Sequence, residues 1–172
     1  PIMYMDKGST ILDENNHVSK AAHEARKRGV IFEAADARAH FGFSTAEPAV
    51  KEEFYPDILG TDLTKLSIYL RPTTFSMANQ LSKYSMLGLP EEKLFEICTV
   101  NPARHMGISD KAGSLTVGHP ADIAVFRREN HEINFGDRPY SDSSAKIRKG
   151  SFIYRPMMTV KNGEIVFRDI TF

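Results

Sequence analysis

Two short apolar runs, each preceded by a helical segment, set the strongest limit on what this chain can fold into. Residues 19–28 predict a helix with Ser19 as its N-cap, and residues 30–32 follow as a buried strand too short to be a helix. A second helix, predicted over residues 45–54, leads to a second short strand within residues 56–62. Because helices and short apolar strands alternate at this spacing, the sequence predicts an α/β fold with parallel strands.

The character of the sequence changes near residue 112, where helical patterns give way to strands and turns. The predicted elements after the second strand are helices over residues 73–87 and 90–99, a helix capped by Asn101, a strand over 121–126, a polar loop over 136–151 and a hairpin over 158–167. An Asn-Gly pair between two β-prone runs is the basis for the hairpin. We therefore expect two parts, residues 1–112 and residues 113–172.

The balance of charge excludes two classes of partner. The chain contains 22 Lys and Arg and 22 Asp and Glu residues, so its formal net charge is zero, which argues against nucleic acid and an anionic membrane as main partners. Its apolar runs are far shorter than the ~20 residues of a membrane span. With Cys98 as the single cysteine, a disulfide framework is excluded, and we expect a cytoplasmic protein.

Three motifs in the second half of the chain follow one another in a recognisable order. They are the run 99–107 (TVNPARHMG), the run 113–123 (GSLTVGHPADI) and the closing run 158–166 (MTVKNGEIV). Together they resemble the C-terminal signature of the amidohydrolase superfamily. The nearest subgroup is similar to the dihydroorotase- and adenine-deaminase-like deacetylases, and the resemblance covers nearly the whole chain.

The resemblance implies a (β/α)8 TIM-like barrel accompanied by a small β-sandwich built from both chain ends. It implies one or two divalent metals, usually zinc, at the carboxyl ends of the barrel strands, with most ligands outside this chain. In this correspondence Val30–Glu33 is strand 7 and Ile58–Thr61 is strand 8. Asp62 then stands where the family has its strand-8 aspartate, so the resemblance makes Asp62 both the catalytic candidate and the candidate metal ligand.

The length of the chain limits how much of such a barrel it can form. A complete barrel needs roughly 250 residues, whereas this chain has 172 and offers two candidate barrel strands, whose edges would be unpaired. The sequence also begins with Pro1 rather than Met. We therefore expect the C-terminal part of an amidohydrolase, in which the missing N-terminal part of the barrel or another chain covers the edges. Homo-oligomerisation and a natural stand-alone protein are the alternatives.

Asp62 has a chemical rationale that matches its position after an apolar strand. A carboxylate there can bind zinc and accept a proton from the water that zinc acidifies, then pass that proton to a leaving group. On the residues alone, a helix or loop cap is the alternative role for Asp62.

Four further residues are candidates for contact with a small-molecule substrate: Asp36, Arg38, His40 and Tyr69. Asp36 stands where the related subgroup has a histidine, a departure that bears on substrate choice more than on metal binding. Arg38 could bind a substrate carboxylate bidentately or form a surface salt bridge. The alternatives for His40 and Tyr69 are an ordinary loop histidine and a tyrosine used for packing or solvent contact.

The resemblance implies that the complete protein is a metal-dependent hydrolase. Its expected substrate is a small cyclic amide, N-acyl or acetylated compound, in which a C–N or ester bond is hydrolysed. Dihydroorotase or adenine deaminase activity on the same scaffold is one alternative, and a non-catalytic homologue is another. This 172-residue piece alone is expected to be inactive, because most of the implied metal ligands lie outside it.

Overall fold

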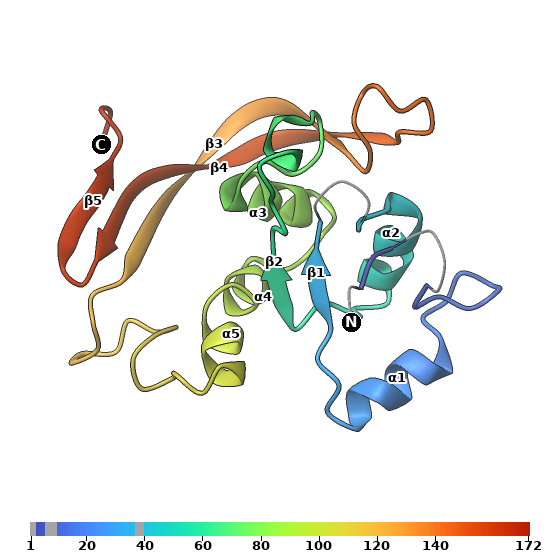
Figure 1. Cartoon of the computed structure of the whole chain (residues 1–172), viewed down its shortest axis with the longest axis horizontal. Helices are drawn as coiled ribbons and strands as arrows, with labels where there is room; N and C mark the ends of the chain where they lie inside the picture. Colours follow the sequence, from blue (N-terminus) through green and yellow to red (C-terminus); the bar gives the residue numbers. More distant parts are fainter. Residues whose placement is uncertain (1–2, 6–9, 37–39) are drawn as a thin grey trace.

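The chain folds into two separate β-sheets joined by short helices (Figure 1). The computed structural model describes residues 3–5, 10–36 and 40–172. One sheet is the parallel pair β1 (Glu33–Ala35) and β2 (Ile58–Gly60), and the other is an antiparallel ribbon in the order β3 (Ile123–Gly136), β4 (Ile147–Lys161) and β5 (Glu164–Arg168). The mixed α/β content and the parallel pairing of the two short strands are confirmed.

The first helix forms as predicted, but the strand after it begins later than expected. Helix α1 (Lys20–Lys27) starts at Ser19, whose hydroxyl accepts the backbone N–H of Ala22 at 3.2 Å. The prediction that residues 30–32 form the strand was wrong, because β1 begins at Glu33. Val30 still belongs to the C-terminal turn of α1, since its N–H donates to the carbonyl of Ala25 at 3.1 Å. Strand pairing with β2 begins three residues later, at Glu33.

Helix α2 (Phe43–Lys51) begins two residues before its predicted start. Pro48 therefore lies in the middle of the helix rather than in its first turn. The start is set by packing: Phe43 is fully buried and, with Ala46 and Ala49, turns one face of α2 into the core. Burial of this face outweighs the cost of a proline inside a helix.

The third helix begins later than predicted and buries polar as well as apolar side chains. The later helices are α3 (Met77–Met86), α4 (Glu91–Glu96) and α5 (Val100–His105), and a 3-10 turn, η1 (Ser67–Tyr69), precedes them. Helix α3 begins at the N-cap Ser76, not at residue 73, and it buries Gln80 and Lys83 although Met77 is exposed. The cause is that α3 contacts both sheets: Gln80 donates to the carbonyl of Gly60 at 2.7 Å, and Ser82 accepts the N–H of Tyr154 in β4.

Asn101 was predicted to cap a helix, but its side chain binds the residue directly before β2 instead. Helix α5 begins at Val100, so Asn101 lies inside its first turn and its side-chain amide donates to the carbonyl of Asp57 at 3.0 Å. The neighbouring backbone bond runs from the N–H of Leu59 to the carbonyl of Ile97. The first bond joins α5 to the residue before β2, and the second joins β2 to the C-cap of α4.

The antiparallel ribbon is longer than its sequence pattern suggests. Strands β3 and β4 extend into the region predicted as a loop over 136–151, leaving residues 137–146 as the connection. The ribbon contains cross-strand pairs of opposite charge, such as Arg155 with Glu129 at 3.4 Å, on a largely exposed surface. The hairpin between β4 and β5 is confirmed, with Asn162 and Gly163 both at positive φ.

An aromatic cluster forms the centre of the core, between the parallel pair, α2 and α3. Its members include Tyr4, Phe41, Phe43 and Tyr84, all essentially inaccessible to solvent. The rings of Phe41 and Phe43 meet edge to face with centroids 5.0 Å apart.

Within the described part of the chain, no helix combines the length and apolarity needed to cross a membrane.

Candidate functional site

The carboxyl ends of β1 and β2 bring two of the predicted site residues together. Asp62 follows β2 by two residues and His40 follows β1 by five, and parallel strands end at the same edge of a sheet. The Nδ1 atom of His40 lies 2.7 Å from Oδ2 of Asp62. The two side chains are 37% and 42% exposed, so the pair is accessible from solvent.

The backbone beneath this pair is held in a defined position. Asp62 has φ of +48°, in the left-handed region that asparagine and aspartate tolerate better than other non-glycine residues. Two residues before it, the carbonyl of Gly60 accepts the side-chain amide of Gln80. The position of the Asp62 backbone is therefore set by a sharp turn at the end of β2, a strand that Gln80 holds in place.

Asp36, which directly follows β1, lies in a different and buried environment. It is 2% exposed, and its Oδ1 accepts the hydroxyl of Tyr84 at 2.7 Å while its Oδ2 accepts the hydroxyl of Thr74 at 3.4 Å. The ammonium of Lys83 forms an ion pair with the same carboxylate. The structure thus gives Asp36 an ion pair within the core, and its contact with a substrate stays a prediction.

Burial changes the ionisation of the groups around Asp36. Burial lowers the pKa of Lys83 from its ordinary value, although the negative charge of Asp36 opposes that shift. Burial, reinforced by the same carboxylate, raises the pKa of Tyr84 well above its usual value. Lys83 also lies 3.8 Å from the centroid of the Phe41 ring, an arrangement that favours a cation over the ring face.

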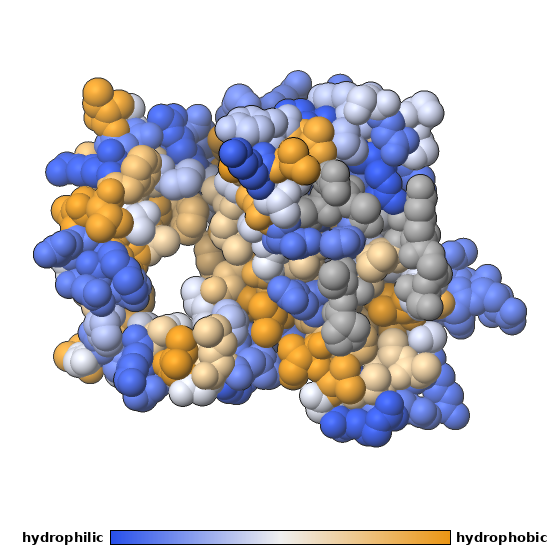
Figure 2. All heavy atoms as spheres, viewed as in Figure 1, coloured by the Kyte–Doolittle hydropathy of each residue, from blue (hydrophilic) through white to orange (hydrophobic). Residues whose placement is uncertain are grey.

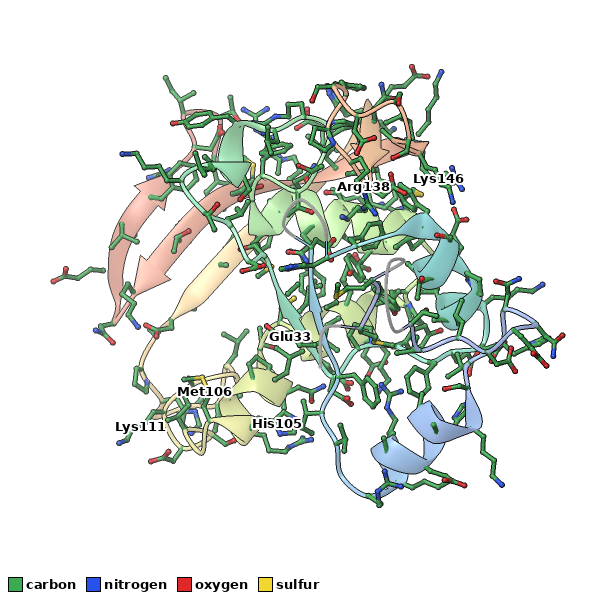
Figure 3. The ribbon with its side chains drawn as sticks, turned by 45° about the vertical axis from the view of Figure 1, so that its right-hand side comes forward. Glu33, His105, Met106, Lys111, Arg138 and Lys146 are labelled. Atoms are coloured by element: carbon green, nitrogen blue, oxygen red, sulfur yellow. The ribbon has the colours of Figure 1, made fainter. Side chains whose placement is uncertain are left out.

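The residue after His40 is anchored from a distant part of the chain. The guanidinium of Arg138, which lies just beyond β3, donates to the carbonyl of Phe41 at 2.8 Å. Figure 3 shows Arg138 near the start of the connection between β3 and β4, well away from Glu33 at the start of β1. The ribbon therefore helps to fix the segment that carries His40.

The remaining predicted residues lie apart from this pair or outside the described residues. Tyr69 is on η1 and is 80% exposed, and Arg38 belongs to the segment 37–39, outside the described residues. Sequence reasoning missed Lys83 and Arg138. The signal for Lys83 was Asp36, an acidic residue directly after a short strand. A carboxylate buried there requires a buried cation as its partner, but the sequence did not show which lysine would supply it.

The donor types at the site suit a zinc ligand set only in part. Asp62 and His40 offer a carboxylate and an imidazole, both of which zinc binds in proteins. Across residues 3–5, 10–36 and 40–172, no three His, Cys, Asp or Glu side chains gather closely enough to hold a metal ion. Asp62 therefore fits as one ligand of a site rather than as part of a complete site within the described residues.

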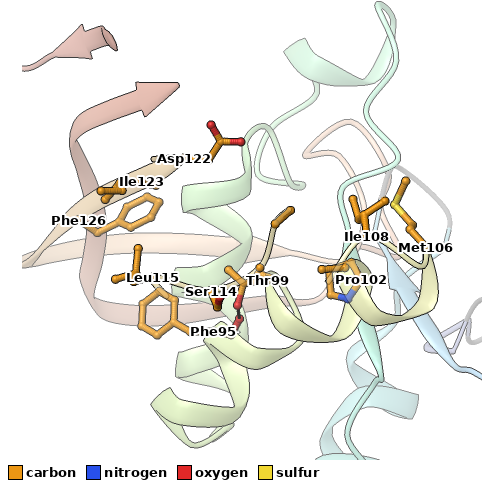
Figure 4. A pocket seen from close by; sticks show the side chains of 15 residues that line it. Phe95, Thr99, Pro102, Met106, Ile108, Ser114, Leu115, Asp122, Ile123 and Phe126 are labelled. Carbon is orange, nitrogen blue, oxygen red and sulfur yellow. Dashed lines mark hydrogen bonds between the residues drawn. The ribbon is translucent and has the colours of Figure 1, made fainter. Parts of the chain in front are cut away.

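A separate apolar pocket lies between α4, α5 and the start of β3 (Figure 4). It has a volume of about 560 Å³, its labelled lining residues include Phe95, Met106, Leu115 and Phe126, and neither His40 nor Asp62 lines it. Figure 2 shows an opening between the β5 end of the ribbon and the segment after α5. Cys98 also lines this pocket, and burial raises the pKa of its thiol to about 12, so the group stays protonated at neutral pH.

Parallel strands with acidic and imidazole side chains at their carboxyl ends are an arrangement that hydrolytic enzymes of the α/β class use. The family model of the amidohydrolase family matches residues 2–166 of this chain. The chain belongs to the amidohydrolase family.

Relatives agree with this assignment and are longer than this chain. It is 32% identical over 151 residues to a dihydroorotase of Aquifex aeolicus (strain VF5), a match covering 85% of this chain and 31% of that protein. It is 26% identical over 164 residues to a deacetylase of Enterococcus faecalis (strain ATCC 700802 / V583), covering 92% of this chain and 42% of that protein. The chain thus spans less than half the length of either relative.

Two solved structures resemble the fold of this chain. The crystal structure of an adenine deaminase superposes with a TM-score of 0.83 at 22% identity, covering 98% of this chain and 44% of that one. The crystal structure of a dihydroorotase superposes with a TM-score of 0.78 at 23% identity, covering 98% of this chain and 41% of that one. Nearly the whole chain therefore matches part of the fold of each of these larger proteins.

Proposed function

We propose that this chain is the C-terminal part of a longer metal-dependent amidohydrolase. The proposed reaction is hydrolysis of a C–N or ester bond in a small cyclic amide, N-acyl or acetylated compound. The observation that carries the proposal is the position of Asp62, an accessible carboxylate at the carboxyl end of β2, in a chain of this family. The names of the relatives, a deacetylase and a dihydroorotase, support the class of substrate.

Asp62 is the residue to which we assign the proton transfer. A bound divalent metal, zinc in this proposal, would act as a Lewis acid and acidify water, with Asp62 as one ligand and the others outside this chain. The carboxylate of Asp62 accepts the proton released from water and later delivers it to the leaving group. Its solvent exposure and its fixed backbone suit a group that exchanges protons with a substrate.

The two sheets correspond, in this proposal, to two parts of the complete enzyme. Residues 1–112 contribute β1 and β2 as the last two strands of a TIM-like barrel, and residues 113–172 contribute the ribbon to a β-sandwich. The pair of strands is too small to bury two faces by itself. The missing N-terminal part of the barrel completes both the metal site and the strand edges.

Three observations favour other candidate functions. The 32% identity to a dihydroorotase favours dihydroorotase activity as the second candidate, and the adenine deaminase structure extends the set to adenine deamination. The ion pair of Asp36 with Lys83 occupies the place of the subgroup's histidine and keeps a non-catalytic homologue in view. Turnover of N-acetylated compounds, dihydroorotate and adenine by the complete protein separates these functions.

The direct test is the Asp62→Asn variant of the complete protein, compared with Asp110→Asn as an exposed control. We expect Asp62→Asn to lower kcat by about 100-fold or more, the scale of a lost general acid–base group. Its thermal midpoint should stay close to that of the parent, because the side chain is exposed. An Asp62→Asn protein with parental turnover would contradict the proposal.

A further inference from the structure

We propose that His40 is a positioning residue that holds the carboxylate of Asp62 in one orientation for proton transfer. The inference rests on the proposed function, because it assigns His40 to the reaction in which Asp62 exchanges the proton. Nδ1 of His40 bonds Oδ2 of Asp62 at 2.7 Å, which restricts rotation of the carboxylate. The bond uses one carboxylate oxygen and leaves Oδ1 for a second partner.

Apart from the metal proposed above, an exposed aspartate has little else to fix its side chain. At 42% exposure, Asp62 would populate several staggered rotamers in the absence of a partner. Proton transfer requires the acceptor to lie within hydrogen-bonding distance of the proton, and a misplacement of about 1 Å can cost about 100-fold in rate. A hydrogen-bonded neighbour therefore has a kinetic effect beyond its small contribution to stability.

His40 can hold Asp62 because its own backbone is fixed. The adjacent Phe41 is buried, packs edge to face on Phe43, and lies under the ammonium of Lys83. Its carbonyl accepts a hydrogen bond from Arg138 at 2.8 Å. These contacts place the imidazole of His40 on a rigid support rather than on a freely moving loop.

The chain provides a matched pair for comparison. Nδ1 of His17 lies 2.7 Å from Oε1 of Glu52, so an imidazole Nδ1 meets a carboxylate oxygen at the same distance as in the His40–Asp62 pair. His17 is 70% exposed and precedes α1, whereas Glu52 caps α2. Neither residue lies at the carboxyl ends of β1 and β2, so this pair reports what a histidine–carboxylate contact does away from the site.

The kinetic test uses the complete metal-loaded enzyme with a substrate found by the screen above. We expect His40→Ala to lower kcat by about 10- to 100-fold with KM changed by less than about threefold and zinc content unchanged. His40→Asn should recover most of the loss, because an asparagine amide can donate from a position close to that of Nδ1. His17→Ala should leave both kinetic constants unchanged.

A second measurement does not depend on activity. In the metal-free complete protein labelled with 15N-histidine, the imidazole resonance assigned to His40 should shift in Asp62→Asn and stay fixed in Glu52→Gln. The resonance of His17 should show the reverse pattern. A His40 resonance that ignores Asp62→Asn would overturn the contact and the inference with it.

The outcomes distinguish the inference from the proposed function. If Asp62→Asn retains turnover, the proposed function fails and the role of His40 fails with it. If Asp62→Asn is inactive but His40→Ala behaves like His17→Ala, the proposed function stands and the positioning role alone is refuted. A loss in His40→Ala that His40→Asn does not recover would also refute it, because the hydrogen bond would not be the cause.

Discussion

Lys83 and Asp36 form an ion pair in the core, where an unpaired charge would be very unfavourable. Both side chains are almost completely inaccessible, and Tyr84 and Thr74 complete the hydrogen bonds of the carboxylate. A buried pair adds little net stability compared with an apolar pair, but removing one partner leaves an isolated charge. This pair therefore makes the position of Asp36 depend on a residue nearly fifty positions later in the chain.

Removing the cation should have a large and recoverable effect on stability. We expect Lys83→Met to lower the free energy of unfolding by about 3–5 kcal/mol, since it leaves the Asp36 carboxylate buried without its partner. The double variant Lys83→Met with Asp36→Leu should recover most of that loss. Lys93→Met is the control: Lys93 forms an exposed ion pair with Glu96, so this variant should leave the urea midpoint unchanged. A double variant as unstable as the single one would contradict this account.

At the scale of elements, α5 holds the segment that enters β2. The motif residue Asn101 donates to the carbonyl of Asp57, and the side chain of Asp57 in turn accepts the N–H of Phe32 at 2.8 Å. Asn101 therefore links a helix, β2 and the segment before β1. This contact gives the motif a structural purpose that its local sequence context does not reveal.

The Asn101→Ala variant tests this link. Loss of the hydrogen bond to the carbonyl of Asp57 should lower the free energy of unfolding by about 1–2 kcal/mol. Asn134→Ala is the control, because its amide bonds the hydroxyl of Tyr140 on the exposed ribbon and its removal should cost less than about 0.5 kcal/mol. Equal urea midpoints for the two variants would show that the hydrogen bond from Asn101 to Asp57 does not stabilise the fold.

Local signals in the sequence predicted elements whose causes are themselves local. The cap of α1 at Ser19 and the turn at Asn162 depend on neighbouring residues, and both predictions were correct. The burial of Gln80 and Lys83 on α3 has no local signal in the sequence, because partners on β2 and beside β1 hold them inside. At the site, the sequence pointed to Asp62 and His40 separately, and only the three-dimensional pairing of β1 with β2 brings them into contact.

At the scale of the whole molecule, the ribbon is joined to the first half of the chain by contacts distant in sequence. Arg138 bonds the carbonyl of Phe41 from inside the core, and Arg148 bonds Glu47 at the surface through two nitrogens at 2.6 and 3.0 Å. The two arginines belong to the same part of the ribbon and differ mainly in burial.

That difference predicts unequal effects for the same substitution. Arg138→Met should lower the free energy of unfolding by about 2–3 kcal/mol, because it leaves the Phe41 carbonyl buried without its charged donor. Arg148→Met should lower it by less than about 1 kcal/mol, the usual range for an exposed ion pair. Thermal denaturation of both variants measures the difference, and an Arg148 effect as large as that of Arg138 would contradict it.

The bond between Arg138 and Phe41 also sets an order of events during synthesis. Ninety-seven residues separate the two, and a ribosome adds about 5–20 residues per second. Phe41 therefore leaves the ribosome roughly 5–20 seconds before Arg138 does. During that interval the segment that carries His40 lacks the hydrogen bond from Arg138, and it gains that bond only after the connection between β3 and β4 has emerged.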